Sequence, residues 1–204
     1  MFQRATEEAL VQLRRERQAQ EYLWNPQLWA KDRAGLHLWS KQAEIAQSVV
    51  DNHDIVVKAG HSIGKSKLAA ILLCWWIDTR WPYGRVASTA PSHHQISAII
   101  WYEVREIVSL VNKRHAEGLT YARMPGHITA DNDWKTDDGQ RVGFGRKPPD
   151  HKTDDAFQGV HAVKHGVLAI GDEAVGLRED MIDALGNITT TEESRRLLIC
   201  NPTN

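Results

Sequence analysis

Cysteine is scarce in this sequence, with only Cys74 and Cys200 among 204 residues. They lie far apart and form no CxxC pair, which argues against a disulfide framework or a thiolate zinc site. Long apolar runs are also missing, since the longest, residues 68–77, is far shorter than the ~20 residues of a membrane-spanning helix. Charged residues interrupt the start of the chain, unlike in a signal peptide. We therefore expect no membrane contact and a reducing, cytoplasmic setting.

An excess of either charge is missing too, because 25 basic and 26 acidic residues give a net charge of −1. This balance excludes a generally basic nucleic-acid coat but leaves room for a local basic patch. Apolar residues make up 42% and charged residues 25%, which is typical of a globular chain. A single domain is the first expectation for 204 residues, because a domain typically holds ~150 residues.

Apolar strands and helices alternate from residue 54 onward. The strands are continuous apolar runs, which is typical of a parallel sheet covered by helices on both faces. In such an α/β fold, ligands bind beyond the carboxyl ends of the strands. Strands are expected at 54–58, 85–90, 166–170 and 197–200, with short ones near Ile128 and Val142, and helices at 41–50, 67–79, 95–115 and 179–185.

The N-terminal segment differs in composition from the rest. Residues 6–20 predict a polar helix with a thin apolar face. Three tryptophans follow it, Trp24, Trp29 and Trp39. Such side chains anchor a segment on a domain by burial, or else stack on nucleic-acid bases. We expect residues 1–40 to be an anchored N-terminal segment and residues 41–204 to form the main domain.

The clearest motif is Lys-Ala-Gly-His-Ser-Ile-Gly-Lys-Ser at residues 58–66, between an expected strand and an expected helix. This is the context of a Walker A loop, whose backbone amides and helix N-terminus form a nest for phosphates. Lys65 would neutralise phosphate charge, and the Ser66 hydroxyl would bind Mg²⁺. Ala59 replaces the first glycine of the usual pattern, and glycine is displaced to position 60. The nucleotide-binding candidates in this loop are Gly60, His61, Ser62, Ile63, Gly64, Lys65 and Ser66.

Two carboxylates, Asp172 and Glu173, follow the apolar strand that ends near residue 170. In a P-loop fold we expect this strand beside the strand of the phosphate loop. Asp172 would then hold Mg²⁺ through a water, and Glu173 would polarise the attacking water, as a hydrolase requires. Alternatively, the pair merely begins a loop. With the Walker A loop, the pair predicts a P-loop NTPase of the ASCE, RecA-like class, with three αβα layers and a mainly parallel central sheet.

A last apolar strand at 197–200 is followed by Asn201-Pro202-Thr203. NTPases with an additional strand between the two Walker strands place a polar residue here that senses the γ-phosphate. The strand at 85–89 is available as that additional strand. Asn201 and Thr203 are therefore the candidates for sensing and coupling, whereas an Asn-Pro turn is the alternative.

Taken together, these residues resemble the ATPase domain of a large terminase subunit, the motor that packages DNA into tailed-phage and herpesvirus capsids. The order and spacing of the motifs cover nearly the whole chain from residue 22. The segments that carry the resemblance are Trp24-Asn25-Pro26, Trp39-Ser40-Lys41-Gln42, residues 58–66, Thr89-Ala90-Pro91-Ser92, Gly171-Asp172-Glu173-Ala174 and Asn201-Pro202-Thr203.

The resemblance assigns roles to further residues. It implies that Gln42 recognises adenine through its amide, which would favour ATP over GTP; an ordinary helix glutamine is the alternative. Terminases commonly carry a basic residue early in the Walker A loop, a role that Lys58 or His61 would fill. The family also uses an arginine from the neighbouring subunit of a ring. No arginine directly precedes the Asp172 strand, so Arg146 is the candidate for this trans-acting finger.

The resemblance also implies a function and partners. The chain would be an ATPase that uses ATP and Mg²⁺ to move double-stranded DNA into a procapsid in the cytoplasm of an infected bacterium. Its partners would be DNA, the capsid portal protein, the small terminase subunit and further copies of itself in a ring. The sequence stops after the presumed sensor strand, so we expect no nuclease activity from this chain and a sheet that ends before its last strand.

Two other functions stay open on the sequence alone. A helicase also pairs Walker motifs with an adenine-reading glutamine, but it needs a second RecA-like domain that 204 residues cannot supply. A nucleotide-binding assembly module with little turnover is the other alternative.

Overall fold

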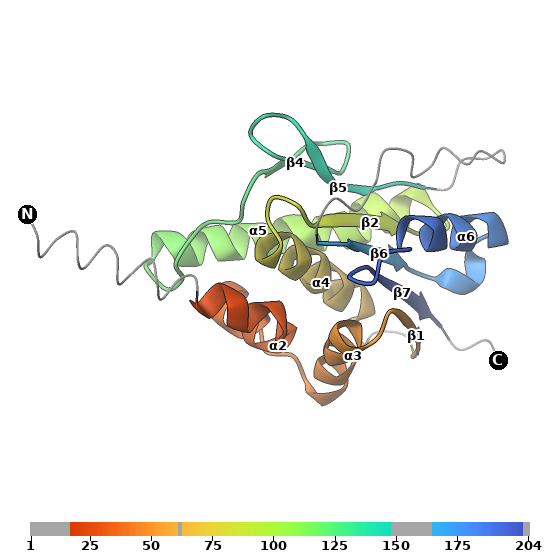
Figure 1. The fold of residues 1–204 in the computed structure, drawn as a ribbon, viewed down its shortest axis with the longest axis horizontal. Helices are drawn as coiled ribbons and strands as arrows, with labels where there is room; N and C mark the ends of the chain where they lie inside the picture. Colours follow the sequence, from red (N-terminus) through yellow and green to blue (C-terminus); the bar gives the residue numbers. More distant parts are fainter. Residues whose placement is uncertain (1–16, 61–62, 148–164, 202–204) are drawn as a thin grey trace, which may run out of the picture.

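The computed structural model of the chain describes residues 17–60, 63–147 and 165–201, and Figure 1 shows a central sheet with helices packed against it. The strands are β1 (Asp54–Lys58), β2 (Arg85–Thr89), β3 (His127–Ile128), β4 (Asp133–Lys135), β5 (Arg141–Gly145), β6 (Val167–Gly171) and β7 (Arg195–Cys200). The helices are α2 (Pro26–Trp29), η1 (Ala30–Ala34), α3 (Ser40–Asp51), α4 (Lys65–Thr79), η2 (Gln95–Ile100), α5 (Trp101–Ala116), η4 (Ala174–Gly176) and α6 (Glu179–Ile188). Three candidate site residues, His61, Ser62 and Thr203, lie outside the described residues.

The sheet has seven strands in the order β1-β7-β6-β2-β5-β4-β3. The first five are parallel neighbours, whereas β4 and β3 are antiparallel additions at one edge. The predicted α/β fold with a mainly parallel sheet is therefore confirmed. In a parallel sheet the carboxyl ends of the strands share one edge, which brings the phosphate loop, Asp172 and Asn201 to the same side.

Two predictions about strand order are wrong. The strand of the acidic pair, β6, does not lie beside β1, because β7 separates them. The additional strand between the two Walker strands is therefore β7, and β2 lies on the far side of β6. All four strands have only five or six residues, so their local sequence does not encode which neighbours they choose. The observed order places Asn201, at the end of β7, between the phosphate loop and the acidic pair.

Helices cover both faces of the sheet. The helix α4 is buried on all sides, with residues 68–77 each at most 2% exposed, because it lies between the sheet, α3 and α5. Side chains alternate between faces along each strand. Val86, Leu168, Ile170, Leu197 and Ile199 pack into the core that contains α4 and α5. Ala87, Phe144, Val167 and Ala169 pack on the opposite face against Met181 and Leu185 of α6.

The N-terminal segment is fastened to α4 by a buried charge pair. The guanidinium of Arg33 is fully buried and forms two hydrogen bonds with the Asp78 carboxylate, at 2.7 and 2.9 Å. The buried indole of Trp29 donates a third hydrogen bond to Asp78, at 2.7 Å. The prediction of tryptophan anchors holds for Trp29 and is wrong for Trp24 and Trp39, which are 60% and 47% exposed.

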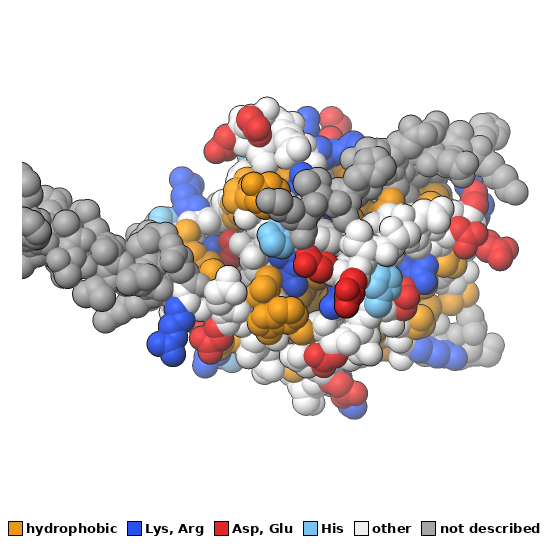
Figure 2. All heavy atoms as spheres, in the orientation of Figure 1, with side chains coloured by type: hydrophobic (Ala, Val, Ile, Leu, Met, Phe, Trp, Pro, Cys, Tyr) orange, Lys and Arg blue, Asp and Glu red, His pale blue; other side chains and the backbone are white. Residues whose placement is uncertain are grey.

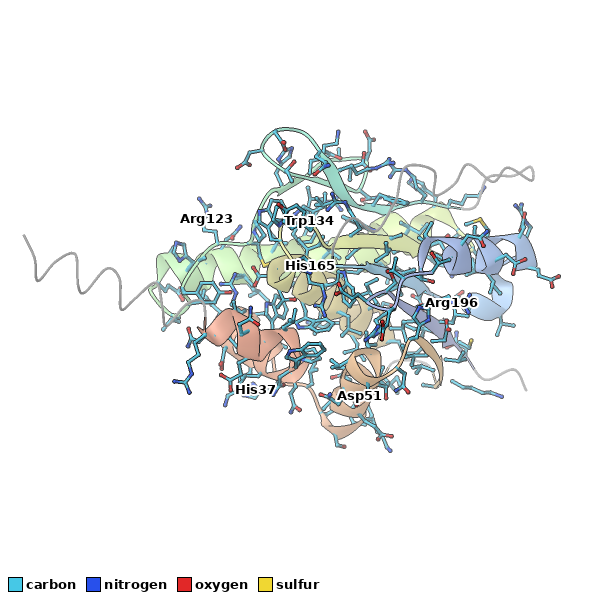
Figure 3. All side chains as sticks on the ribbon, in the orientation of Figure 1. His37, Asp51, Arg123, Trp134, His165 and Arg196 are labelled. Atoms are coloured by element: carbon cyan, nitrogen blue, oxygen red, sulfur yellow. The ribbon has the colours of Figure 1, made fainter. Side chains whose placement is uncertain are left out.

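The hairpin of β4 and β5 extends the sheet at the top of Figure 1. Trp134 of β4, labelled in Figure 3, is buried there and donates a hydrogen bond from its indole to the Pro125 carbonyl, at 2.9 Å. The helix predicted over 95–115 is present, but its first six residues, Gln95–Ile100, form a wider π-helical turn. Among the described residues, we find no helix whose length and apolar character suit a membrane crossing.

Candidate nucleotide site

The phosphate loop runs from the end of β1 to the start of α4. Gly64 precedes the helix with a φ of +79°, a left-handed conformation that favours glycine. A β-carbon at Gly64 would also lie 2.8 Å from the amide nitrogen of Gln42. A β-carbon at Gly60 would have no other atom within 4 Å, so open space adjoins the backbone at this residue. The first turn of α4 follows directly on this loop, so its free backbone amides are available to bind an anion.

Lys65 is the best-connected side chain of the loop. Its ammonium donates to the carbonyl oxygens of Ala59 and Gly60, at 2.7 and 2.6 Å, and to Oδ1 of Asn201, at 2.5 Å. An ammonium has three protons, so all of its donors are used. Lys65 therefore joins the phosphate loop to the end of β7.

Ser66 and Asp172 form the pair suited to a metal ion. The Ser66 hydroxyl donates to Oδ2 of Asp172 at 3.1 Å, across the gap between α4 and β6. Asp172 is 5% exposed, and this burial raises the pKa of its carboxyl, against the lowering effect of hydrogen bonds from the Glu173 amide and Ser66. A hydroxyl and a buried carboxylate are hard oxygen donors of the kind that Mg²⁺ takes, and a cation there would offset the cost of burying the charge. The residues present therefore fit Mg²⁺.

Glu173 is held in an unusual conformation by a partner that we did not predict. Its backbone is left-handed, with a φ of 49°, which costs about 1–3 kcal/mol in a non-glycine residue and marks functional sites. Its Oε2 accepts a short hydrogen bond from the side-chain amide of Gln95. Gln95 is fixed in turn, because its Oε1 accepts from the backbone amide and the hydroxyl of Ser92, each at 2.9 Å. One carboxylate oxygen of Glu173 is thus oriented from the loop after β2.

These groups surround one cleft of about 360 Å³. Its lining residues are Gly64, Lys65, Ser66, Lys67, Glu103, Asp172, Glu173 and Asn201. Lys65, the candidate metal pair Ser66 and Asp172, the candidate base Glu173 and the candidate sensor Asn201 thus line the same cleft. Glu103, from the first turn of α5, was also not predicted, and it lies 3.9 Å from the ammonium of Lys67.

Gln42 borders a second, apolar hollow behind the loop. Its amide donates to the carbonyl oxygen of Ile63 at 3.3 Å, so the side chain contacts the phosphate loop from α3. The half-exposed indole of Trp39 lies at the mouth of this hollow. The other lining residues are Ile45, Val57, Ile63, Lys65, Leu68 and Ile199. The hollow encloses only about 10 Å³, room for about one water, so it holds no base in this form. The exposed face of Trp39 and the neighbouring Gln42 amide are the groups that suit the flat face and polar edge of a base.

Arg146 lies apart from this cleft. Its guanidinium forms an ion pair with Asp133 at 2.6 Å and donates to the carbonyl oxygen of Asp131 at 2.8 Å. It lines a separate cleft of about 520 Å³ with His93, Ser97 and Asn132 among others. Arg146 therefore does not reach the nucleotide cleft of its own chain. Lys58 ends β1 with an exposed side chain, outside the residues that line the cleft.

The signal for Gln95 was present in the sequence but incomplete. The segment Thr89-Ala90-Pro91-Ser92 follows a strand, and a glutamine three residues after a serine can exchange hydrogen bonds with it at the start of a helix. The structure shows this exchange, since the backbone N–H of Gln95 donates to the Ser92 hydroxyl at 3.2 Å and the Gln95 side chain accepts from the Ser92 backbone N–H. The contact with Glu173 depends on β2 lying beside β6, which the sequence alone did not indicate.

Comparison with solved structures identifies the fold. A large terminase from a thermophilic bacteriophage matches with a TM-score of 0.58 and 15% identity, over 80% of this chain and 39% of that one. The HK97 bacteriophage large terminase matches with a TM-score of 0.55 and 20% identity, over 81% and 33%. The large terminase ATPase domain of Thermus phage P74-26 matches with a TM-score of 0.54 and 16% identity, over 85% and 68%. No protein-family model and no curated protein matches the sequence.

The chain spans about two fifths or less of the length of the first two terminases. The match to the separate ATPase domain covers a larger share of both chains. The molecule is similar to the ATPase portion of these proteins, and its fold is that of a phage large-terminase ATPase domain.

Proposed function

We propose that this chain is the ATP-hydrolysing motor domain of a viral DNA-packaging machine, coupling hydrolysis of Mg·ATP to the movement of double-stranded DNA into a procapsid. The observation that carries this proposal is that Lys65 and Ser66, at the start of α4, converge on one cleft with Asp172 and Glu173, which directly follow β6. A fold shared with large terminases supports the choice of this motor among P-loop hydrolases.

The triphosphate binds where the loop amides, the α4 N-terminus and Lys65 concentrate positive charge. Ser66 and Asp172 are the residues that would hold Mg²⁺. The ion, when bound, neutralises charge on the phosphates and on the departing diphosphate. A related terminase from a thermophilic bacteriophage has been solved in complex with ADP, with a TM-score of 0.55 to this chain and 16% identity.

Glu173 activates the attacking water. Gln95 engages Oε2, which leaves Oε1 to accept a hydrogen bond from water at the edge of the cleft. The water oxygen attacks the γ-phosphorus in line, the bond to the bridging oxygen breaks, and ADP leaves while Glu173 receives the proton of the water. Holding the carboxylate in one orientation keeps this water aligned, which is the positioning part of catalysis.

Base recognition falls to Gln42 and the neighbouring Trp39. The Gln42 amide offers a donor and an acceptor, which the amino group and a ring nitrogen of adenine would match. Its nitrogen donates to the Ile63 carbonyl, so the amide would lose this contact if it flipped to match the reverse pattern of guanine. Trp39 is half exposed beside it and would stack on the ring. ATP is therefore the expected nucleotide over GTP.

DNA would be gripped by phosphate charge and not by base sequence, because a packaging motor must accept any sequence. Figure 2 shows basic and acidic side chains interspersed over the drawn face, without an extended field of one sign among the described residues. A grip built from a few local cations fits this surface and the net charge of −1. The portal protein, the small terminase subunit and a ring of identical copies complete the proposal.

Arg146 stays our candidate for the arginine that reaches into the neighbouring copy's cleft. Its side chain is 33% exposed, so it is accessible from outside. To act in the neighbour, the guanidinium would have to exchange Asp133 for phosphate oxygens, which are also paired anionic acceptors. A trans role therefore predicts that the Arg146–Asp133 ion pair opens when the ring assembles.

The division of labour in the cleft can be tested with two variants. Lys65→Ala is expected to weaken ATP binding, while Glu173→Ala keeps ATP binding and loses turnover by ~10²-fold or more. Binding is measured by calorimetry with Mg·ATP and turnover by phosphate release. Equal loss of binding in both variants would contradict the assigned roles. Lys113→Ala, an exposed change on α5 remote from the cleft, is the control.

The coupling to DNA needs a second assay. Phosphate release with and without blunt double-stranded DNA, in the presence of portal and small subunit, is expected to rise with DNA. Strand separation of that duplex would favour a helicase instead. Nucleotide binding without hydrolysis above background under all of these conditions would leave the assembly-module alternative and overturn the motor proposal.

A further inference from the structure

We propose that Asn201 competes with nucleotide phosphate for Lys65, and so sets the affinity of the cleft for ADP as well as ATP. This inference rests on the proposed function, because it assumes that the cleft takes a nucleotide. It assigns Asn201 a role in the empty state that differs from sensing the γ-phosphate.

The three acceptors on Lys65 are not equivalent. The carbonyl oxygens of Ala59 and Gly60 are backbone groups of the loop itself, whereas the Asn201 oxygen belongs to a side chain that can rotate away. Asn201 comes from β7, 136 residues along the chain, and its contact is the shortest of the three at 2.5 Å. It is thus the one acceptor among the described residues that ties the lysine to another element.

The chemistry fixes the orientation of the Asn201 amide. An ammonium can only donate, so the atom that faces Lys65 must be the amide oxygen and not the nitrogen. Hydrogen bonds to a charged donor are stronger than those between neutral groups. Asn201 therefore offers the lysine charge a neutral oxygen, whereas a nucleotide would offer it an anionic one.

A phosphate that binds Lys65 must displace at least one of these acceptors, because no fourth proton is available. The free energy of the lost Lys65–Asn201 contact therefore makes the free energy of nucleotide binding less favourable. The same holds for any ligand that binds only one of two states of a protein. Since the Walker A lysine contacts the β- as well as the γ-phosphate, the exchange takes place with ADP too. Asn201 would then leave Lys65 when either ADP or ATP binds.

A γ-phosphate sensor predicts a different pattern. Such a residue contacts only the terminal phosphate, so its removal changes ATP turnover and leaves ADP affinity alone. Competition predicts that removing Asn201 tightens ADP binding. The two roles therefore predict different results for a variant without Asn201: altered ATP turnover at unchanged ADP affinity for a sensor, and tighter ADP binding for a competitor.

The test measures ADP and ATP affinity by calorimetry for three changes at this position. Asn201→Ala and Asn201→Leu remove the competing oxygen, and both are expected to bind ADP roughly ten- to hundredfold more tightly, since a hydrogen bond to a charged group is lost from the nucleotide-free protein alone. Asn201→Asp places a carboxylate against Lys65 and is expected to weaken ADP binding at least about fivefold. Titrations repeated in EDTA exclude a new metal contact by the aspartate. Asn187→Ala, an exposed asparagine on α6, is the control and is expected to bind as wild type.

The outcomes separate the two proposals. Wild-type protein that binds neither nucleotide would overturn the proposed function and this inference together. Wild-type binding with unchanged or weaker ADP affinity in both Asn201→Ala and Asn201→Leu would overturn only the inference. Thermal unfolding without nucleotide identifies a variant that fails to fold, and the remaining two then decide the question.

Discussion

Gln95 gives the sharpest prediction about the proposed catalysis, because it donates to the carboxylate of Glu173, our candidate base, and is not among the residues that line the candidate nucleotide cleft. Gln95→Ala removes the donor to Oε2 of Glu173 and the acceptor that fixes Ser92. A hydrogen bond to a charged group is worth about 1.5–3 kcal/mol. If that energy orients Glu173 in the transition state, kcat falls roughly ten- to hundredfold, at about 1.4 kcal/mol for each factor of ten.

The assay is steady-state phosphate release over a range of ATP concentrations. KM for ATP is expected to stay near that of wild type, since the side chain of Gln95 bonds Ser92 and Glu173 and no described residue of the phosphate loop. Gln95→Glu keeps the length of the side chain but sets a like charge against Glu173, so it is expected to lose more activity than Gln95→Ala. Gln47→Ala, an exposed glutamine on α3 that bonds only Asp51, is the matched control. An unchanged kcat in Gln95→Ala, or a loss carried entirely by KM, would refute the positioning role.

Three further predictions concern stability and specificity. Asp78→Ala leaves the Arg33 charge buried without its partner, which costs about 3–5 kcal/mol of folding stability. Calorimetry should show a Tm lower by roughly 6–20 °C. A Tm within 2 °C of wild type, roughly half a kcal/mol, would contradict the anchoring role. Asp172→Asn removes a carboxylate whose pKa is raised by burial, so the nucleotide-free variant should be at least as stable as wild type. In a thermal-shift assay the stabilisation by Mg·ATP should disappear. Retained stabilisation by Mg·ATP would argue against the metal site. Gln42→Ala should reduce the preference for ATP over GTP by roughly tenfold in competition binding, which is the scale of one lost hydrogen bond to the base. An unaltered preference would show that Gln42 is an ordinary helix residue.

The sequence predicted the elements of this fold better than their arrangement. Apolar runs and the Gly64-Lys65-Ser66 turn mark β1, α4 and β6 within a residue or two of their observed bounds, because periodicity and turn chemistry are local properties. The position of β7 between β1 and β6 is set by packing across the whole sheet, and no local signal carries it. The wrong strand order did not mislead the site prediction, since every parallel strand delivers its carboxyl end to the same edge.

The candidate site shows the same division. Lys65, Ser66, Asp172 and Glu173 were predicted because each follows a recognisable motif, and the structure brings them to one cleft. Gln95 was missed because its partner lies 78 residues away, across two neighbouring strands. Trp24 and Trp39 were misjudged because an aromatic residue fits a buried anchor and an exposed stacking surface equally well, and only packing distinguishes them.

The central claim is that the phosphate loop and the acidic pair act on the same triphosphate. The most direct test is an experimental structure with Mg²⁺ and a non-hydrolysable ATP analogue. The account predicts β- and γ-phosphate oxygens within hydrogen-bonding distance of Lys65, the ion between Ser66 and Asp172, and the γ-phosphorus on the side of Glu173. A nucleotide bound in the cleft beside Arg146, or an analogue that leaves Lys65 on its present three oxygens, would contradict it.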